Sequence, residues 1–386
     1  MQRTIKCPML STEAVRNALR ATAEAFANAA NDVLAVSRAL KTSNKVTLQH
    51  AAYRKIREKH GLSANLAIRA IARVAYAVKV AEQRERYVSG FKPTSIDYDL
   101  RIFAWRPQDE SVSLTTVSGR IHVPLKLGRY QREALAGKSP TCARVVRQGT
   151  DWVIHIVVDE TEPPKQGGPP LGIDLGIRSI ATLSTGRKIS GAKVRAIKDR
   201  YARIRASLQS KGTHGARRLL KRLSGRERRY IAWMNHNVSK AIIRDAVAHG
   251  RGILRFEDLR GIRARTKTWS RHLNRMISGW SFGELQAFSE YKALRAGLST
   301  EYLNPAWTSE THHACGRRGV RSFAKFWLYC PTCDRVEDAD KNAATNIEAG
   351  GVRAGEIPAV RNGTRIGDVL VGFFGNRHTS VKSPAL

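Results

Sequence analysis

The chain has 386 residues, with 67 Lys and Arg against 32 Asp and Glu, which gives a formal net charge of +35. Such an excess of positive charge predicts a polyanionic partner, and nucleic acid is the first candidate. No run approaches the roughly 20 apolar residues of a membrane span, and the N-terminus MQRTIKCPML lacks the apolar region of a signal peptide. We therefore expect a soluble cytoplasmic protein of two or three domains that binds no membrane.

Five cysteines are present, and three of them fall between positions 315 and 333. This clustering is unlike the evenly spread thiols of a secreted disulfide framework, and in a reducing compartment it indicates a metal site. Cys7 and Cys142 stand alone, and we expect each to be a small buried apolar residue.

The first 90 residues predict a short strand followed by helices. Residues TIKCPML form the expected strand, and Ser11 or Thr12 can cap an Ala-rich helix that reaches about Leu40. Two more helices are expected, over about 47–59 and 63–86, because apolar residues recur there at helical spacing.

From Phe91 to the end of DWVIHIVVDE, short runs of β-branched residues lie between Gly, Pro and Asp turn signals. This pattern predicts a small β-barrel or sandwich, interrupted by one helix around GRYQREALAG. The segment EPPKQGGPP, residues 162–170, is rich in Pro and Gly, and we expect it to be the linker to the next domain.

Beyond the linker the pattern is that of an α/β domain. LGIDLGIRS and IATLST predict a hairpin, and a long helical region follows. A buried strand is expected over 252–259, then the amphipathic helix SFGELQAFSEYKALRAG, a strand at TEYLNP, the cysteine segment and a final helix at DKNAATNI. The residues after about Gly351 predict a loosely ordered tail.

Three acidic residues stand where two strands and the last helix would present them. Asp174 lies within the apolar LGIDLG, Glu257 ends the apolar run ILRFED, and Asp340 opens the last helix. Each has an ordinary alternative: Asp174 as a turn residue, Glu257 as a polar strand end, and Asp340 as an N-cap. Together, carboxylates that converge at one end of an α/β sheet predict a two-metal nuclease, in which they hold two divalent ions.

Three segments resemble the three RuvC motifs of the TnpB family, the transposon-encoded RNA-guided nucleases related to the compact Cas12 effectors: LGIDLGIRSIATLSTG, ILRFEDLRGI and DADKNAATNI. Connecting segments such as FKPTSIDYDLRIFAW, GRERRYIAWMNHNVSKAI and NPAWTSET resemble the family too, so the resemblance extends over about 91–347. By motif position, Asp174, Glu257 and Asp340 correspond to the family's catalytic acids, which bind two Mg²⁺ ions.

The resemblance implies an α/β protein with an RNase H-like (RuvC) nuclease domain and an inserted zinc ribbon, preceded by a wedge β-barrel that carries a helical recognition insertion. The implied parts are the first wedge strand at 1–10, the recognition helices at 11–90, the wedge barrel at 91–165, the first part of the RuvC domain at 166–305, the zinc ribbon at 306–337, the last RuvC helix at 338–352 and a flexible tail at 353–386.

The implied activity is Mg²⁺-dependent, RNA-guided cleavage of DNA. A guide RNA from the transposon end would pair with double-stranded target DNA beside a short adjacent motif, while the protein reads backbone shape and that motif. One protein per RNA is expected in a prokaryotic cell, with the associated transposase as a functional partner. Three alternatives stay open: a nuclease-inactive RNA-guided repressor, a miniature Cas12-type CRISPR effector, and a basic zinc-ribbon protein without catalysis.

The segment THHACG…CPTC raises the question of which residues would hold a metal. In the family this segment carries C-x-x-C twice, whereas here a histidine stands at the first cysteine position. Zinc binds Cys₃His sets as well as Cys₄ sets. The implied ligands of one Zn²⁺ ion are His312, Cys315, Cys330 and Cys333. His313 is a competing ligand, and a metal-free ribbon packed through Phe323, Phe326 and Trp327 is the other alternative.

A basic stretch runs from 193 to 229, where fourteen Lys and Arg stand against two acids. Such a run is usually a solvated helix face, yet its self-repulsion favours a bound anion, and guide RNA or the heteroduplex is the natural one. Tyr201 and Tyr230 are candidates to stack on bases, although helical spacing favours core packing for Tyr230. The predicted nucleic-acid contacts are Lys193, Arg195, Lys198, Arg200, Arg217, Arg218, Lys221 and Arg222.

Overall fold

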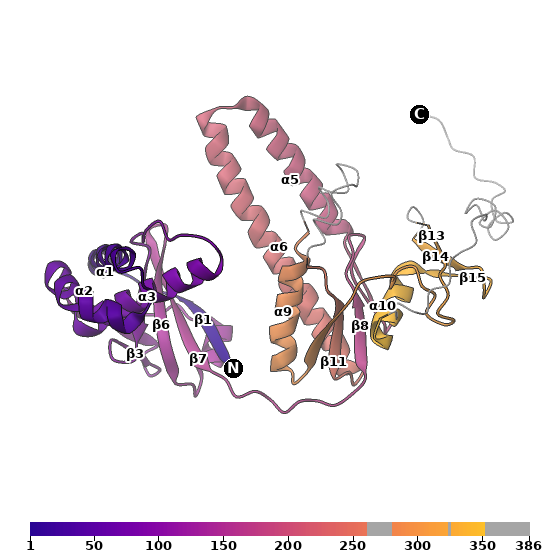
Figure 1. Ribbon diagram of the computed structural model, residues 1–386, viewed down its shortest axis with the longest axis horizontal. Coiled ribbons are helices and arrows are strands. Elements are labelled where there is room, and N and C mark those ends of the chain that lie inside the picture. Colours follow the sequence, from indigo (N-terminus) through magenta and orange to yellow (C-terminus); the bar gives the residue numbers. More distant parts are fainter. Residues whose placement is uncertain (261–279, 323–325, 352–386) are drawn as a thin grey trace. The chain divides into compact units, whose positions relative to one another are not determined.

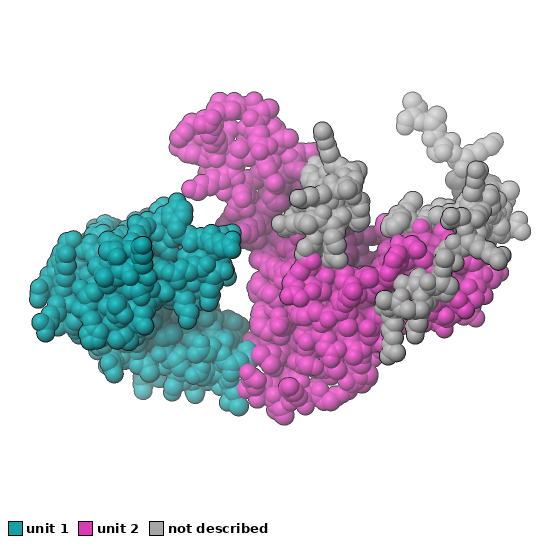
Figure 2. Space-filling view, viewed as in Figure 1, with its two compact units in different colours: residues 1–161 teal, residues 162–386 magenta. Residues whose placement is uncertain are grey.

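The computed structural model of the protein describes residues 1–260, 280–322 and 326–351 (Figure 1). The chain divides into two compact units, Met1–Thr161 and Glu162–Leu386, which Figure 2 shows in separate colours. The tail predicted at 353–386 lies outside the described residues. Within the described ranges, no helix is both long and apolar enough to cross a membrane.

Unit 1 opens with a strand and three helices, as the sequence predicts: β1 (Gln2–Pro8), α1 (Glu13–Ala39), α2 (Lys45–His60) and α3 (Ala64–Gln83). Of the two candidate caps of α1, Thr12 is the one used, and its hydroxyl accepts a hydrogen bond from the backbone N–H of Val15. Helix α2 begins two residues before the predicted start because the Asn44 side chain accepts from the backbone N–H of Val46 at 2.8 Å. Gly61, with a φ of 61°, ends that helix in the left-handed conformation.

The rest of unit 1 is antiparallel β-structure with the predicted helix inserted. Its elements are β2 (Ser95–Asp99), β3 (Phe103–Arg106), β4 (Ser111–Thr116), β5 (Gly119–Pro124), α4 (Arg129–Leu135), β6 (Pro140–Gln148) and β7 (Asp151–Asp159). One sheet has the order β1-β7-β6-β2 and the other β3-β4-β5, and a bridge between Met9 and Leu125 links them. The buried residues of both sheets and of the helices form one core.

The isolated cysteines differ from each other. Cys7 is buried in the core of unit 1, as expected, and burial raises the pKa of its thiol to about 11. Cys142 was expected to be buried as well, but that prediction is wrong because the residue is only half-buried in β6.

Unit 2 is built on a five-stranded mixed sheet with the order β10-β9-β8-β11-β12. The strands are β8 (Pro170–Asp174), β9 (Ser179–Leu183), β10 (Lys188–Ser190), β11 (Ile253–Glu257) and β12 (Ser299–Leu303). β8 and β9 form the predicted antiparallel hairpin, whereas β11 runs parallel to both β8 and β12. The side chains of Leu171, Ile173, Leu254 and Phe256 are fully buried and form the centre of the unit 2 core.

Helices α5 (Ala192–Lys211) and α6 (His214–Ala248) form a long pair that extends away from this sheet (Figure 1). The C-terminal part of α6 packs on the core through Val238, Ile242 and Ala246, beside α9 (Phe282–Arg295). In α5 only Val194 is buried. Most of the pair therefore exposes its side chains, in agreement with its high content of Lys and Arg.

The last described part of unit 2 is a three-stranded antiparallel ribbon followed by a helix: β13 (Val320–Ser322), β14 (Trp327–Cys330), β15 (Arg335–Asp338) and α10 (Ala339–Ala349). α10 packs directly on β8. A Cβ atom at Gly172 would lie 2.0 Å from the carbonyl oxygen of Ala344, so only glycine permits this approach. The Arg255 guanidinium donates a hydrogen bond of 2.6 Å to the carbonyl of Glu348 and fixes the end of the helix.

Candidate active site and metal-binding knuckle

The three predicted acids gather at one edge of the unit 2 sheet. Asp174 ends β8 and Glu257 ends β11, and because these neighbouring strands are parallel, both side chains stand at the same edge. Asp340 lies in the first turn of α10, which packs on β8. The N-cap of α10 is Asp338, whose side chain accepts a hydrogen bond of 2.9 Å from the backbone N–H of Lys341. The alternative that made Asp340 the N-cap is therefore wrong.

The surroundings of Asp174 oppose its ionisation. The pKa of Asp174 lies well above its ordinary value because its environment desolvates it and because the charges of Glu257 and Asp340 act on it. The positive charge of Arg321 opposes this shift without cancelling it. Asp174 therefore has two acidic neighbours that oppose its ionisation, an arrangement that is frequent at functional sites.

Neighbouring side chains orient two of the acids. The Thr308 hydroxyl donates a hydrogen bond to Glu257 Oε1, and the Gln286 amide on α9 donates to the Glu257 carbonyl at 2.8 Å. The Ser179 hydroxyl donates to Asp340 Oδ2 at 3.3 Å, and Arg321 Nη2 lies 3.7 Å from Asp340 Oδ1. The Glu257 and Asp340 carboxylates therefore have defined orientations at the sheet edge.

The donor set of this cluster fits divalent cations. Carboxylate oxygens are the ligands that Mg²⁺ prefers, and a cation among these three acids would offset the repulsion that raises the pKa of Asp174. Unit 2 thus contains three residues that could hold Mg²⁺: Asp174, Glu257 and Asp340.

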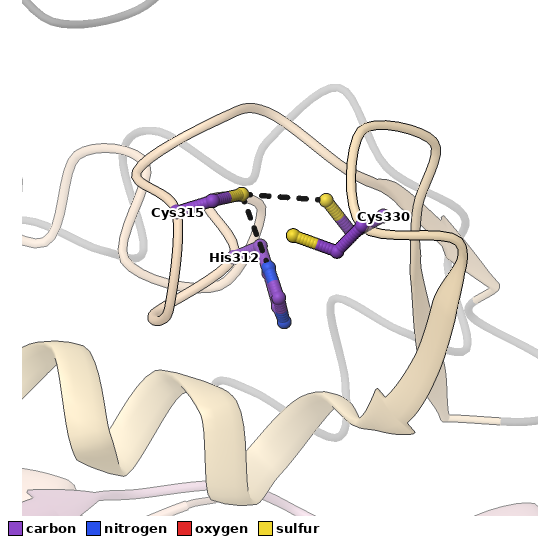
Figure 3. A group of neighbouring side chains, drawn as sticks. His312, Cys315 and Cys330 are labelled. Carbon is purple, nitrogen blue, oxygen red and sulfur yellow. Dashed lines mark hydrogen bonds between the residues drawn. The ribbon is translucent and has the colours of Figure 1, made fainter.

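The second cluster is a Cys₃His group in the ribbon, and its ligand atoms all lie within 4.8 Å of one another. Its members are His312, Cys315, Cys330 and Cys333. His312 Nδ1 lies 3.2 Å from Cys315 Sγ, which in turn lies 3.5 Å from Cys330 Sγ (Figure 3). Ligands around a tetrahedral Zn²⁺ ion with Zn–S bonds of 2.3 Å are about 3.8 Å apart, so the group fits this metal.

The structure separates the two adjacent histidines. The buried His312 ring turns Nδ1 to the thiols, whereas its Nε2 makes no hydrogen bond and lies 3.5 Å from Glu337 Oε1. His313 instead contacts Glu337 Oε2 at 3.0 Å and the Asn342 side chain. His312 is therefore the residue that completes the cysteine group, and Glu337 stands where a carboxylate commonly orients a metal-binding histidine.

Two of the thiols differ in how readily they ionise. Burial opposes ionisation of Cys315, but hydrogen bonds from His312 and from the Arg317 backbone lower the pKa of its thiol to about 7. The hydrogen bond with Cys315 and burial raise the pKa of Cys333 to about 11. Adjacent thiols ionise together only when a cation compensates them, which is the chemistry of a metal-binding knuckle.

For the metal-free alternative, Phe323 lies outside the described residues, and the Phe326 ring centroid lies 4.2 Å from the Arg178 guanidinium.

The predicted nucleic-acid contacts lie on the α5–α6 pair. Those with exposed side chains are Lys193, Arg200, Arg217, Arg218, Lys221 and Arg222, and Arg195 is half-buried. Lys198 is different because its ammonium lies 4.8 Å from the Trp280 ring centroid, and burial lowers the pKa of this lysine. Of the two aromatic candidates, Tyr230 is half-buried and its ring lies 6.0 Å from that of Trp233.

Two family models match the chain in unit 2 and the end of unit 1. Residues 153–263 match OrfB_IS605, described as "Probable transposase", and residues 282–347 match the TNB domain of Cas12f1-like proteins. A TnpB-like protein of Methanocaldococcus jannaschii is 33% identical over 158 residues, 40% of this chain and 56% of the relative. A Streptomyces pristinaespiralis protein named "Putative RNA-guided DNA endonuclease" is 30% identical over 281 residues, 70% of this chain and 66% of the relative.

The chain belongs to the TnpB family.

The fold has a solved counterpart. A Cas12f1 in complex with sgRNA and target DNA aligns with a TM-score of 0.62 and 17% identity, over 87% of this chain and 83% of that one. The mixed α/β fold is thus that of a Cas12 effector. The chain spans just over half to about two thirds of the two curated relatives' lengths.

Several residues that shape the acid cluster were not singled out from the sequence. Thr308, Asn342 and Asn346 are all buried near the acids, and their hydrogen bonds join segments far apart in the chain. A signal was present, because Asn342 and Asn346 are four residues apart in the third TnpB-like motif and so share one helix face.

Proposed function

We propose that this member of the TnpB family is an RNA-guided DNA endonuclease of a transposable element. It binds a guide RNA derived from the transposon end and cleaves double-stranded target DNA beside a short adjacent motif. The observation that carries the proposal is the gathering of Asp174, Glu257 and Asp340 at the ends of β8 and β11 and in the first turn of α10, where desolvation and the two acidic neighbours raise the pKa of Asp174. The Streptomyces pristinaespiralis relative, whose name is "Putative RNA-guided DNA endonuclease", supports the same activity.

The mechanism follows from the residues at the sheet edge. Asp174, Glu257 and Asp340 are the residues that would hold two Mg²⁺ ions, through their carboxylate oxygens. When bound, the ions supply an activated water and stabilise the leaving oxygen of a phosphodiester. The protein contributes rigid placement, since two of the acids stand on neighbouring strands and the third on a helix packed against them.

We also assign the finer parts of the fold on this basis. The five-stranded sheet with α10 is an RNase H-like RuvC domain, the ribbon is a zinc-binding insertion in it, and the two antiparallel sheets of unit 1 are a wedge barrel that carries the recognition helices α1–α3. The mixed sheet order and the Cys₃His group support these assignments.

The partners are guide RNA and target DNA, bound in part by the α5–α6 pair. Its exposed Lys and Arg can contact phosphates, and each lost contact lowers the salt dependence of binding by about one unit of slope. We expect one protein per RNA in the cytoplasm of a prokaryotic cell, with the transposase as a functional partner.

The test uses the protein expressed together with the DNA that flanks its gene, so that any guide RNA co-purifies and can be sequenced. The complex is incubated with plasmids that carry the guide-matched target beside a randomised flank, with Mg²⁺ or without it. Cleavage should require Mg²⁺ and one flanking motif. The Asp174→Ala variant should lose at least ~10³-fold in cleavage rate and still bind the target.

The matched control is Asp159→Ala, because Asp159 also ends a strand, β7, but is exposed and outside the acid cluster. It should cut like the parent. Target binding without cleavage by the parent would favour the repressor instead. A repeat array rather than a transposon end beside the gene would make the protein a miniature CRISPR effector.

A further inference from the structure

The segment 308–313 between β12 and the ribbon is held by two asparagines of α10. The side-chain amides of Asn342 and Asn346 each donate a hydrogen bond of 2.7 Å to the carbonyl of Thr311. Asn346 also donates to the carbonyl of Thr308 at 2.8 Å, and the Asn342 side-chain oxygen accepts from the backbone N–H of His313 at 2.8 Å. The backbone of this segment is consequently fixed to one face of α10.

Thr308 extends this attachment to the acid cluster. Its side chain is fully buried, and its hydroxyl donates to Glu257 Oε1. A hydroxyl has a single proton, and among the described residues its other acceptor is the Pro305 carbonyl at 3.2 Å. Donation to a carboxylate is the stronger of the two bonds because the acceptor is charged.

These contacts form a continuous path from α10 to Glu257. The helix that carries Asp340 binds Thr308 through Asn346, and Thr308 binds the Glu257 side chain. A glutamate side chain has three rotatable bonds, so its carboxylate needs an external contact to keep one orientation. The path therefore ties the orientation of one acid to the helix that presents another.

We propose that Thr308 and Asn346 are positioning residues that set the Glu257 carboxylate relative to Asp340, with Asn342 fixing the same segment. The inference rests on the proposed function, in which both acids bind metal. The segment contains His312 of the knuckle and leads directly to Cys315, so the knuckle and the acid cluster share one support.

The test compares Thr308→Val, which keeps the β-branched shape and removes the hydroxyl, with Thr308→Ser, which keeps the hydroxyl. The matched control is Thr345→Val, because the Thr345 hydroxyl donates only to the backbone of its own helix, to the Lys341 carbonyl at 3.1 Å. Each variant is purified with zinc bound. Its Mn²⁺ affinity is measured by calorimetry without guide RNA, its Tm is measured, and cleavage is followed as a function of Mg²⁺ concentration.

Thr308→Val should lower the Mn²⁺ affinity about 10- to 100-fold and raise the Mg²⁺ concentration for half-maximal cleavage in parallel. Thr308→Ser should restore both within about twofold, whereas the Tm of Thr308→Val should match that of Thr345→Val within a few degrees. If Thr308→Val fails to fold, Thr308→Ala, which adds no bulk, replaces it.

Mn²⁺ affinity equal to that of the parent in Thr308→Val, or an equal loss in Thr308→Ser, would overturn the positioning role. Glu257→Gln separates this failure from failure of the proposed function. If Glu257→Gln cuts like the parent, the acid assignment itself is wrong. If it loses both Mn²⁺ affinity and cleavage while Thr308→Val does not, only the positioning role is wrong.

Discussion

Each unit contains a strand aspartate whose pKa the fold shifts, in opposite directions: the buried Asp97 in unit 1 and the half-buried Asp174 in unit 2. Asp97 in β2 receives hydrogen bonds from Arg73 and Arg144. Burial alone would raise the pKa of Asp97, but the two arginines outweigh it and hold the pKa below its ordinary value. Asp174 in β8 faces Glu257 and Asp340, and its pKa is raised.

The difference distinguishes a structural acid from one that the proposed function makes a metal ligand. The arginines of the fold itself neutralise Asp97, so it stabilises unit 1 without any ligand. Asp174 belongs to a cluster in which negative charge exceeds positive charge, and the folded chain alone does not balance it. Under the proposed function, this excess of negative charge is what a bound divalent cation would offset.

The largest effect is expected from Asp97→Ala, which leaves the mostly buried Arg73 guanidinium without its counter-charge. The free energy of unfolding of unit 1 should fall by about 3–5 kcal/mol. Hydrogen exchange of unit 1 peptides in increasing urea measures the loss, with the exposed Asp151→Ala as control. A loss no larger than that of the control would remove the contrast between the two acids.

The same pair predicts a pH dependence for unit 1. Because the pKa of Asp97 is lower in the folded state than its ordinary value of 3.8, its stabilisation is present above about pH 4 and is lost as the pH falls further. Acidification from pH 5 to 2.5 should therefore destabilise parental unit 1 more steeply than unit 1 of Asp97→Asn.

The Cys₃His knuckle is the second cluster that could hold a cation, because its thiols would be negatively charged when they bind one. A structural zinc site contributes roughly 10–16 kcal/mol from four ligands, so His312→Ala should lower zinc affinity by about 3 kcal/mol, or more than ~100-fold. His312→Cys should retain affinity, and His313→Ala is the matched control. Competition with a zinc-binding dye measures the affinities. Greater dependence on His313 would mean that the wrong histidine has been assigned.

The smallest effect tests the uncompensated acid directly. In zinc-loaded protein without Mg²⁺, Asp174→Asn removes one of three mutually repelling charges and should raise the free energy of unfolding of unit 2 by about 1 kcal/mol, or roughly 2–4 °C in Tm. Added Mn²⁺ should stabilise the parent and not the variant, since only the parent retains the full donor set. A variant less stable than the parent would make Asp174 a structural acid like Asp97.

Much of the architecture could be predicted because local patterns determine it. Apolar periodicity and capping residues predict α1, α3 and α9, and the apolar runs that end in Asp174 and Glu257 predict β8 and β11. The convergence of the acids follows from parallel strand order, which the α/β pattern implies.

What the sequence did not predict depends on contacts between distant segments. Strand β10 has three residues, too few to show a period, and it exists because it pairs with β9. The bond from Thr308 to Glu257 joins residues 51 positions apart. The cation–π contact that half-buries Lys198 depends on where Trp280 folds. The sequence around Thr308 or Lys198 does not show which distant residue it will contact.

The close packing of α10 against Gly172 of β8 also has a consequence for synthesis on the ribosome. Ser179 and Asp340, which share a hydrogen bond, are 161 positions apart, so the hairpin emerges on the order of ten seconds before the helix that completes the acid cluster. A nascent chain that has not reached α10 contains only two of the three acids. Under the proposed function, the protein therefore acquires its ability to cut DNA only after nearly all of its described elements have been translated.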